Sequence, residues 1–217
     1  MARKKAWIAS HRKERFYTQA KQEGYRARAV YKLKEMDEKF HLFSGVTSAL
    51  DLCCSPGSWL EYSIAAIQKK AKKSPNDSAP VVGVDIVSVR PIPGVISLRA
   101  DITKETIFEQ IQPHLPAPPE LVLSDCSPHV SGHKEADHEM QAFLFERALA
   151  IARRFLVPGG SFVGKLFQGL EFHRLVRQLQ NEFTSVQSFK PKASSPTSPE
   201  MYVVAKGFQK SNEKKPG

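Results

Sequence analysis

The stretch TSALDLCCSPGSW, residues 47–59, decides the fold, because it joins an apolar strand to the start of a helix through a short turn. The serine, proline and glycine of this turn interrupt the apolar run and let the backbone approach a ligand closely. The turn carries one glycine where the dinucleotide fingerprint G-x-G-x-x-G requires three. It therefore predicts a ligand site after the strand, and it disfavours a nicotinamide-dependent oxidoreductase.

Apolar strands and amphipathic helices alternate along the rest of the chain. Strands are predicted at 47–54, 80–87, 94–102, 120–128, 159–169, near 185–190 and at 201–208. Helices are predicted within 24–40, after residue 57, and at 104–112, 135–156 and 171–183. This order is typical of a mostly parallel sheet with helices on both faces. Only PKASSPTSP separates the last two strands, so we expect them to form an antiparallel pair at one end of the sheet.

Positive charge is concentrated at the N-terminus. The chain has a formal net charge of +10, and residues 1–34 hold eleven Lys or Arg residues against two Glu residues. Such a block suits a polyanion, most simply nucleic acid, or is a solvated basic arm. Tyr17, Tyr25 and Tyr31 lie among these cations, where they would stack on RNA bases or pack into the core as part of a docked helix.

The apolar runs and the cysteines of the sequence limit where in the cell we expect the protein to be. No apolar run has the roughly 18 residues of a membrane helix, and the N-terminus lacks the apolar core of a secretory signal. We therefore predict a cytoplasmic protein with no membrane association, while the basic residues 1–16 leave an organelle open. Cys53 and Cys54 are adjacent and Cys126 is isolated, which gives neither a disulfide framework nor zinc-ligand spacing.

Three carboxylates end three successive predicted strands, namely Asp85, Asp101 and Asp125. An acidic residue at the place of Asp85 typically binds the ribose hydroxyls of an adenosine-type ligand. Each alone could be a helix cap or a turn former. Because the carboxyl ends of parallel strands share one edge, the three together favour a ligand site.

Lys165 interrupts the apolar strand GGSFVGKLFQG, where an unpaired ammonium group would lose its hydration. Asp125 ends the neighbouring strand, and Glu200 opens the last, antiparallel strand at the same edge. Lys32 of the N-terminal basic helix could dock above them. We expect two lysines and two carboxylates to meet beside a pocket for a nucleoside.

The ordered set of motifs resembles the FtsJ-like family of S-adenosylmethionine-dependent ribose 2′-O-methyltransferases, over about residues 15–208. The segments are EGYRARAVYKL, DLCCSPGSW, VDIV, ADIT, SDCSP, GGSFVGKLFQG and KPKASSPTSPEMYVV. The resemblance implies a Rossmann-like seven-stranded methyltransferase sheet with an antiparallel last strand. It implies a catalytic tetrad of Lys32, Asp125, Lys165 and Glu200. It also implies cofactor contacts at Gly57, Trp59, Asp85, Asp101 and Asp125.

The resemblance further implies a function. S-adenosylmethionine would be the cofactor and S-adenosylhomocysteine its product, and the target would be a 2′-hydroxyl of a uridine in large-subunit rRNA. Lys165 would accept the proton, with Lys32 favouring its uncharged form and steering an RNA phosphate. Alternatives are a tRNA anticodon-loop or eukaryotic rRNA methyltransferase, and a non-catalytic RNA-binding ribosome-assembly factor. We predict a monomer with an RNA-contacting helical extension at 1–40, a methyltransferase domain at 41–208 and a disordered tail at 209–217.

The family pattern differs from this chain at some small residues and in one loop. Ala-Ala-Pro-Gly is common where the chain has Cys54-Ser55-Pro56-Gly57, and the loop before Glu200 lacks the arginine often found there. Three histidines, His129, His133 and His138, lie near Cys126 and Asp137 and could indicate a metal site. A substrate-facing loop and helix start explain them better, so we predict no metal.

Overall fold

The computed structural model describes residues 14–71, 81–115, 117–129 and 131–210. The strands are β1 (Ala49–Leu52), β2 (Val81–Asp85), β3 (Val95–Arg99), β4 (Leu121–Ser124), β5 (Ser161–Phe167), β6 (Phe183–Phe189) and β7 (Glu200–Phe208). The α-helices are α2 (Val30–Phe40), α3 (Ser58–Ala71), α4 (Ile107–Ile111), α5 (Lys134–Phe155) and α6 (Leu170–Gln180), and residues 14–22 are also helical. A 3-10 turn, Gln112–His114, follows α4.

All seven strands form one sheet in the order β3-β2-β1-β4-β5-β7-β6. Strands β3, β2, β1, β4 and β5 are parallel, and β7 lies antiparallel to both β5 and β6. The predicted fold class is therefore confirmed, including the antiparallel pair at one end. Several predicted boundaries differ: the strand predicted at 120–128 ends at Ser124, and the helix predicted to reach residue 183 ends at Gln180. Phe183 instead opens β6, because its ring packs on Phe208 with centroids 5.2 Å apart.

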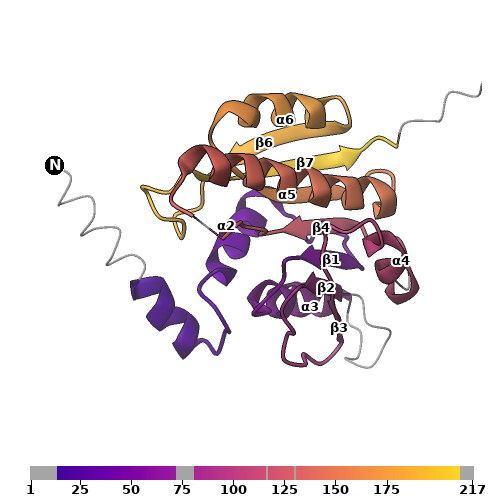
Figure 1. The fold of residues 1–217 in the computed structure, drawn as a ribbon. Coiled ribbons are helices and arrows are strands. Elements are labelled where there is room, and N and C mark those ends of the chain that lie inside the picture. Colours follow the sequence, from indigo (N-terminus) through magenta and orange to yellow (C-terminus); the bar gives the residue numbers. More distant parts are fainter. Residues whose placement is uncertain (1–13, 72–80, 116, 130, 211–217) are drawn as a thin grey trace, which may run out of the picture.

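Helices cover both faces of the sheet and enclose a core on each (Figure 1). Helices α4, α5 and α6 bury one core, in which Phe145 of α5 packs on Phe162 of β5. Helices α2 and α3 bury the other core. The positions of α2 expected from its apolar period, Val30, Leu33, Met36 and Phe40, are all buried, and so are Tyr31 and Lys32. In the described part of the chain, no helix is long and apolar enough to cross a membrane.

The N-terminal segment is fixed to the sheet by specific contacts. The indole N–H of Trp59 donates to the carbonyl of Ala29 at 2.8 Å. The Arg26 guanidinium pairs with Glu61 and donates to the carbonyl of Arg90 at 2.7 Å. Arg26 therefore ties the start of α2 to α3 and to the loop after β2, which holds α2 over the carboxyl edge of the sheet. Residues 1–13 and 211–217 of the predicted extension and tail lie outside the described residues.

Candidate active site

Four side chains from distant parts of the sequence meet at the carboxyl edge. Lys165 of β5 lies 3.1 Å from Asp125, measured from Nζ to Oδ1, and also donates to the Asp125 carbonyl at 2.7 Å. Lys32 of α2 lies 2.7 Å from Glu200, measured from Nζ to Oε1. Lys165 is only 5% exposed and Lys32 only 8% exposed. The structure therefore brings together the four residues that the sequence predicted would meet, and it supplies a partner for each buried ammonium group.

Tyr202 joins the two ion pairs and was missed by the sequence analysis. Lys32 donates to its hydroxyl at 3.1 Å, and the hydroxyl donates to Asp125 Oδ1. Tyr202 is fully buried between β5 and β6, where it pairs with Lys165 across the β5–β7 ladder. One hydrogen-bonded network thus runs from Glu200 through Lys32 and Tyr202 to Asp125 and Lys165.

Burial and the charges of the network set the protonation states of Asp125 and Tyr202. Burial opposes the charged form of Asp125, but the positive charges of Lys165 and Lys32 and the bonds from Tyr202 and Lys165 outweigh it and lower the pKa of Asp125. Burial, together with the charges of Asp125 and Glu200, raises the pKa of Tyr202 well above its ordinary value. Asp125 is therefore a carboxylate and Tyr202 a neutral hydroxyl at neutral pH.

The loop between β6 and β7 closes one side of this network. Glu200 Oε1 accepts a hydrogen bond from Ser194 at 2.7 Å. The Glu35 carboxylate of α2 accepts the backbone N–H of Ala193 at 2.8 Å, and Arg28 donates to the Ala193 carbonyl at 3.0 Å. The loop without the family arginine is therefore held by α2 and by the segment before it.

A cavity of about 630 Å³ lies at the ends of β2, β3 and β4, and it shares Cys53 with a smaller cavity that Asp125 lines. Asp85 and Asp101 line it, as the sequence predicted for an adenosine-type ligand. The Asp85 carboxylate accepts backbone N–H groups of Ser55 at 2.9 Å and Val87 at 2.8 Å, so it also shapes two loops. Asp101 accepts from the backbone and hydroxyl of Thr103, and chiefly the backbone bond lowers the pKa of Asp101.

Asp51, at the centre of β1, is a buried acid that the sequence analysis did not identify. It is 1% exposed, and neither carboxyl oxygen has a hydrogen-bond partner among the described residues. Burial first, then the charges of Asp125 and Asp85, raise the pKa of Asp51 well above its ordinary value. It lines a cavity of about 20 Å³ together with Trp59 and Asp125. An orphaned carboxyl group at this place fits the amino group of an amino-acid-like ligand.

Gly57 lies in the turn before α3 and has a left-handed backbone, with φ of 109°. A Cβ atom there would come within 2.9 Å of the Val89 side chain. The glycine is therefore required by the backbone and by close packing, whether or not it contacts a ligand.

Two cysteines form a disulfide, which the sequence analysis did not predict. Cys53 follows β1 and Cys126 follows β4. Their sulfur atoms are bonded to each other, and their Cα atoms lie 5.0 Å apart. The expectation that the cysteines give no disulfide was wrong, because β1 and β4 are neighbours in the sheet although the two cysteines are 73 residues apart. The bond ties the turn after β1 to the segment that carries Asp125. Cys54 is buried with a free thiol.

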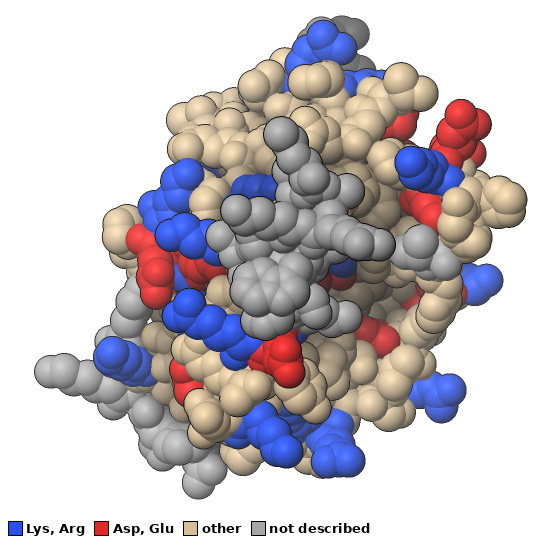
Figure 2. Space-filling view, turned by 90° about the vertical axis from the view of Figure 1, so that its left-hand side faces the viewer, with Lys and Arg blue, Asp and Glu red and all other residues tan. Residues whose placement is uncertain are grey.

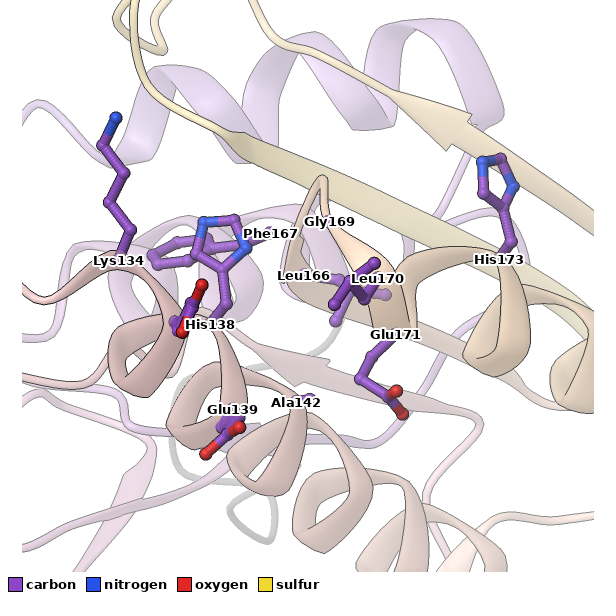
Figure 3. A pocket seen from close by; sticks show the side chains of 11 residues that line it. Lys134, His138, Glu139, Ala142, Leu166, Phe167, Gly169, Leu170, Glu171 and His173 are labelled. Atoms are coloured by element: carbon purple, nitrogen blue, oxygen red, sulfur yellow. The ribbon is translucent and has the colours of Figure 1, made fainter.

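The histidines do not gather at one place. His129 lines the cavity of 630 Å³, whereas His138 lines a separate cavity of about 830 Å³ between the first turns of α5 and α6 (Figure 3). In that cavity His138 lies against Phe167, with ring centroids 5.5 Å apart. Within the described ranges, no group of three His, Cys, Asp or Glu side chains could hold a metal ion.

Fold and site together define a Rossmann-like methyltransferase, because an antiparallel β7 between β5 and β6 extends a parallel sheet whose carboxyl edge carries an acid-lined cavity. The profile of the FtsJ-like methyltransferase family matches residues 25–208. The chain belongs to this family, as its motifs indicated, and it is a methyltransferase.

Known relatives are similar over most of the chain. A ribosomal RNA large subunit methyltransferase E of Methanothrix thermoacetophila is 39% identical over 199 residues, which cover 92% of this chain and 74% of that protein. A human tRNA (cytidine(32)/guanosine(34)-2′-O)-methyltransferase is 40% identical over 194 residues, covering 89% of this chain and 57% of that protein. A crystal structure from Plasmodium falciparum, assigned as a ribosomal RNA methyltransferase, is 27% identical with a TM-score of 0.70, over 85% of this chain and 98% of that one.

Proposed function

We propose that this enzyme transfers a methyl group from S-adenosylmethionine to a ribose 2′-hydroxyl of RNA, most simply a uridine of large-subunit rRNA. The observation that carries the proposal is the paired network of Lys165 with Asp125 and Lys32 with Glu200, next to a cavity lined by acids. The name of the archaeal relative supports the choice of RNA. A cytoplasmic location and a monomeric state are part of the proposal and stay predictions.

The residues present fit the cofactor. Asp85 and Asp101 would hold its ribose and base at the ends of β2 and β3, and Asp51 would receive its amino group. Trp59 and Gly57 would shape the methionine end. S-adenosylmethionine would supply an electrophilic methyl group on a sulfonium and would leave as S-adenosylhomocysteine.

The chain's own part of the reaction is alignment and proton removal. Lys165 would first lose its own proton to solvent and would then accept the proton of the 2′-hydroxyl at Nζ, while the oxygen bonds to the methyl carbon and the bond from that carbon to sulfur breaks. Asp125 then neutralises the ammonium group that forms, because Nζ already contacts its carboxylate and its carbonyl. We place Lys32 behind this pair: it is buried against Glu200 and Tyr202, so it orders the network rather than meeting an RNA phosphate at the surface.

Basic side chains lie around the carboxyl edge. Figure 2 views this side of the molecule and shows several groups of Lys and Arg with Asp and Glu among them. Some of the N-terminal cations are used within the protein, since Arg26 pairs with Glu61 and Lys34 with Glu23. Tyr31, which the sequence offered for RNA stacking or for the core, is 5% exposed and belongs to the core. Tyr17 is 64% exposed and stays available to RNA.

A second substrate has specific support. The human relative is named for methylation of two tRNA nucleotides, and it is as similar to this chain as the archaeal one. A tRNA anticodon loop is therefore the alternative target of the same reaction.

The test uses the full chain with labelled S-adenosylmethionine and two RNA pools, large-subunit rRNA and tRNA, from cells lacking the gene. We expect label in a 2′-O-methylated nucleotide of rRNA, and none after the target ribose is replaced by 2′-deoxyribose. Label confined to tRNA would select the alternative. Label on a base, or no label with either pool, would contradict the proposed function.

A further inference from the structure

Gln141 is a buried amide on a mostly apolar face of α5, one turn after the buried Asp137. It is 0% exposed, and its neighbours on this face of the helix include Phe145 and Ala148. Its Nε2 group donates to the carbonyl of Lys165 at 2.8 Å and to the carbonyl of Cys126 at 3.2 Å. Both acceptors are carbonyl oxygens, so the NH2 end of the amide must face them.

The amide is not explained by packing. Its Oε1 atom has no hydrogen-bond partner in the part of the chain that the structure describes, and a buried oxygen of this kind lowers stability. An apolar side chain of similar length would fill the same space without that penalty. The two N–H bonds are therefore the feature that an amide alone provides here.

Those bonds begin where the sheet ladder ends. The last paired residues of β4 and β5 are Ser124 and Gly164. Asp125 and Lys165 are the next residues along these two strands, so no hydrogen-bonded pairing between β4 and β5 fixes the distance between them. The Gln141 amide bridges the gap, because one nitrogen holds the carbonyl of Lys165 and that of the residue after Asp125.

We propose that Gln141 is a positioning residue that sets the separation of Asp125 and Lys165 by binding both strand ends beyond their last pair. The inference rests on the proposed function, in which this pair accepts the proton. Gln141 does not touch the reacting atoms; it acts through the carbonyls of Lys165 and of Cys126, the residue after Asp125.

The test variant is Gln141→Met, which keeps the length of the side chain and removes both donors. We expect kcat to fall by about 10- to 100-fold, the loss that a displacement on the order of 1 Å produces, with the Kd of the cofactor unchanged. We also expect the pH at which kcat is half-maximal to move, because the partner of Lys165 moves. The matched control is Leu149→Val, on the buried face of the same helix. It lowers stability but should leave both kcat and the pH profile as in the wild type.

Two further readouts keep the test decisive. If Gln141→Met does not fold, Gln141→Asn replaces it, because the same amide on a shorter stem cannot reach both carbonyls. A crystal structure of the variant should show Lys165 Nζ withdrawn from the Asp125 carboxylate. An intact pair in that structure, or a kcat within about twofold of wild type with an unmoved pH profile, would overturn the inference. If wild-type protein fails to methylate RNA, the proposed function fails, and the structure of the variant alone decides the role of Gln141.

Discussion

Asp125 follows β4 and Asp51 lies within the neighbouring strand β1, yet one is fully partnered and the other has no partner among the described residues. Asp125 meets Lys165 and Tyr202, and the positive charges around it lower its pKa. Asp51 meets no donor within the described part of the chain, and burial raises its pKa. The tetrad side is thus complete in the protein alone, whereas the cofactor side holds an acid that a ligand would complete.

The largest effect is expected on the complete side. Lys165→Met removes the proposed proton acceptor, so turnover should fall by about 10²–10⁴-fold in the labelled-methyl assay. The control is Lys206→Met, a lysine at the opposite end of the same strand pair, where Lys206 faces Ser161. Near-normal turnover in Lys165→Met would assign proton removal to another group.

The covalent tie between the two sides should contribute to stability. Reduction of the Cys53–Cys126 bond, which closes a loop of 73 residues, should lower the free energy of unfolding by about 2–4 kcal/mol. Denaturation with and without reductant measures this. Cys126→Ser should lose the response to reductant, while Cys54→Ala should keep it, because Cys54 is not bonded. A wild-type protein indifferent to reductant would show that the bond is not formed in solution.

The orphaned acid should lower stability in a pH-dependent way. Folded Asp51 retains its proton, while the unfolded chain releases it above about pH 3.9, so the wild type loses stability as pH rises through that value. Asp51→Asn should therefore be more stable by about 1–3 kcal/mol at pH 7, with the gain vanishing near pH 4.

The change in stability caused by Asp101→Asn should have the opposite sign at pH 7 from that caused by Asp51→Asn. The pKa of Asp101 is lowered in the fold, so its carboxylate stabilises the protein above its ordinary pKa and this contribution is lost as pH falls. Denaturation curves between pH 4 and 8 compare the two variants. Equal signs for both would mean that Asp51 is not a neutral, unpartnered acid.

The smallest effect is expected at Trp59, where a substitution tests whether the indole N–H anchors the Ala29 segment or contacts the cofactor. Trp59→Phe keeps an aromatic ring but removes the bond to the Ala29 carbonyl and part of the buried ring volume, so the free energy of unfolding should fall by at least the ~1 kcal/mol of that bond. Cofactor affinity should change by less than about threefold. A larger loss of affinity would mean that the indole N–H serves the cofactor.

Much of this arrangement could be predicted from local patterns. Lys165 was identifiable because an ammonium group contradicts the apolar strand around it, and Asp85 and Asp125 because they end such strands. The antiparallel end pair followed from the short connection between the last two strands. These signals need only neighbours in the sequence.

The rest depends on contacts that the sequence does not show. Tyr202 lies in a strand and Gln141 in a helix, and nothing in the sequence around them marks either as a site residue. Their hydrogen bonds to Asp125 and to the Lys165 carbonyl, seen only in the structure, connect them to the site. The disulfide needs β1 beside β4, which no local pattern reveals. Asp51 was the exception, since it carries the same contradiction as Lys165 within TSALDL and was not singled out.

We assign proton removal to Lys165 and cofactor binding to Asp51. Calorimetric titration of S-adenosylmethionine into Lys165→Met and Asp51→Asn tests this assignment most directly. The account predicts that Lys165→Met binds within about threefold of wild type, while Asp51→Asn loses roughly tenfold or more, the worth of a hydrogen bond to a charged group. Equal losses in both variants, or wild-type affinity in Asp51→Asn, would contradict it.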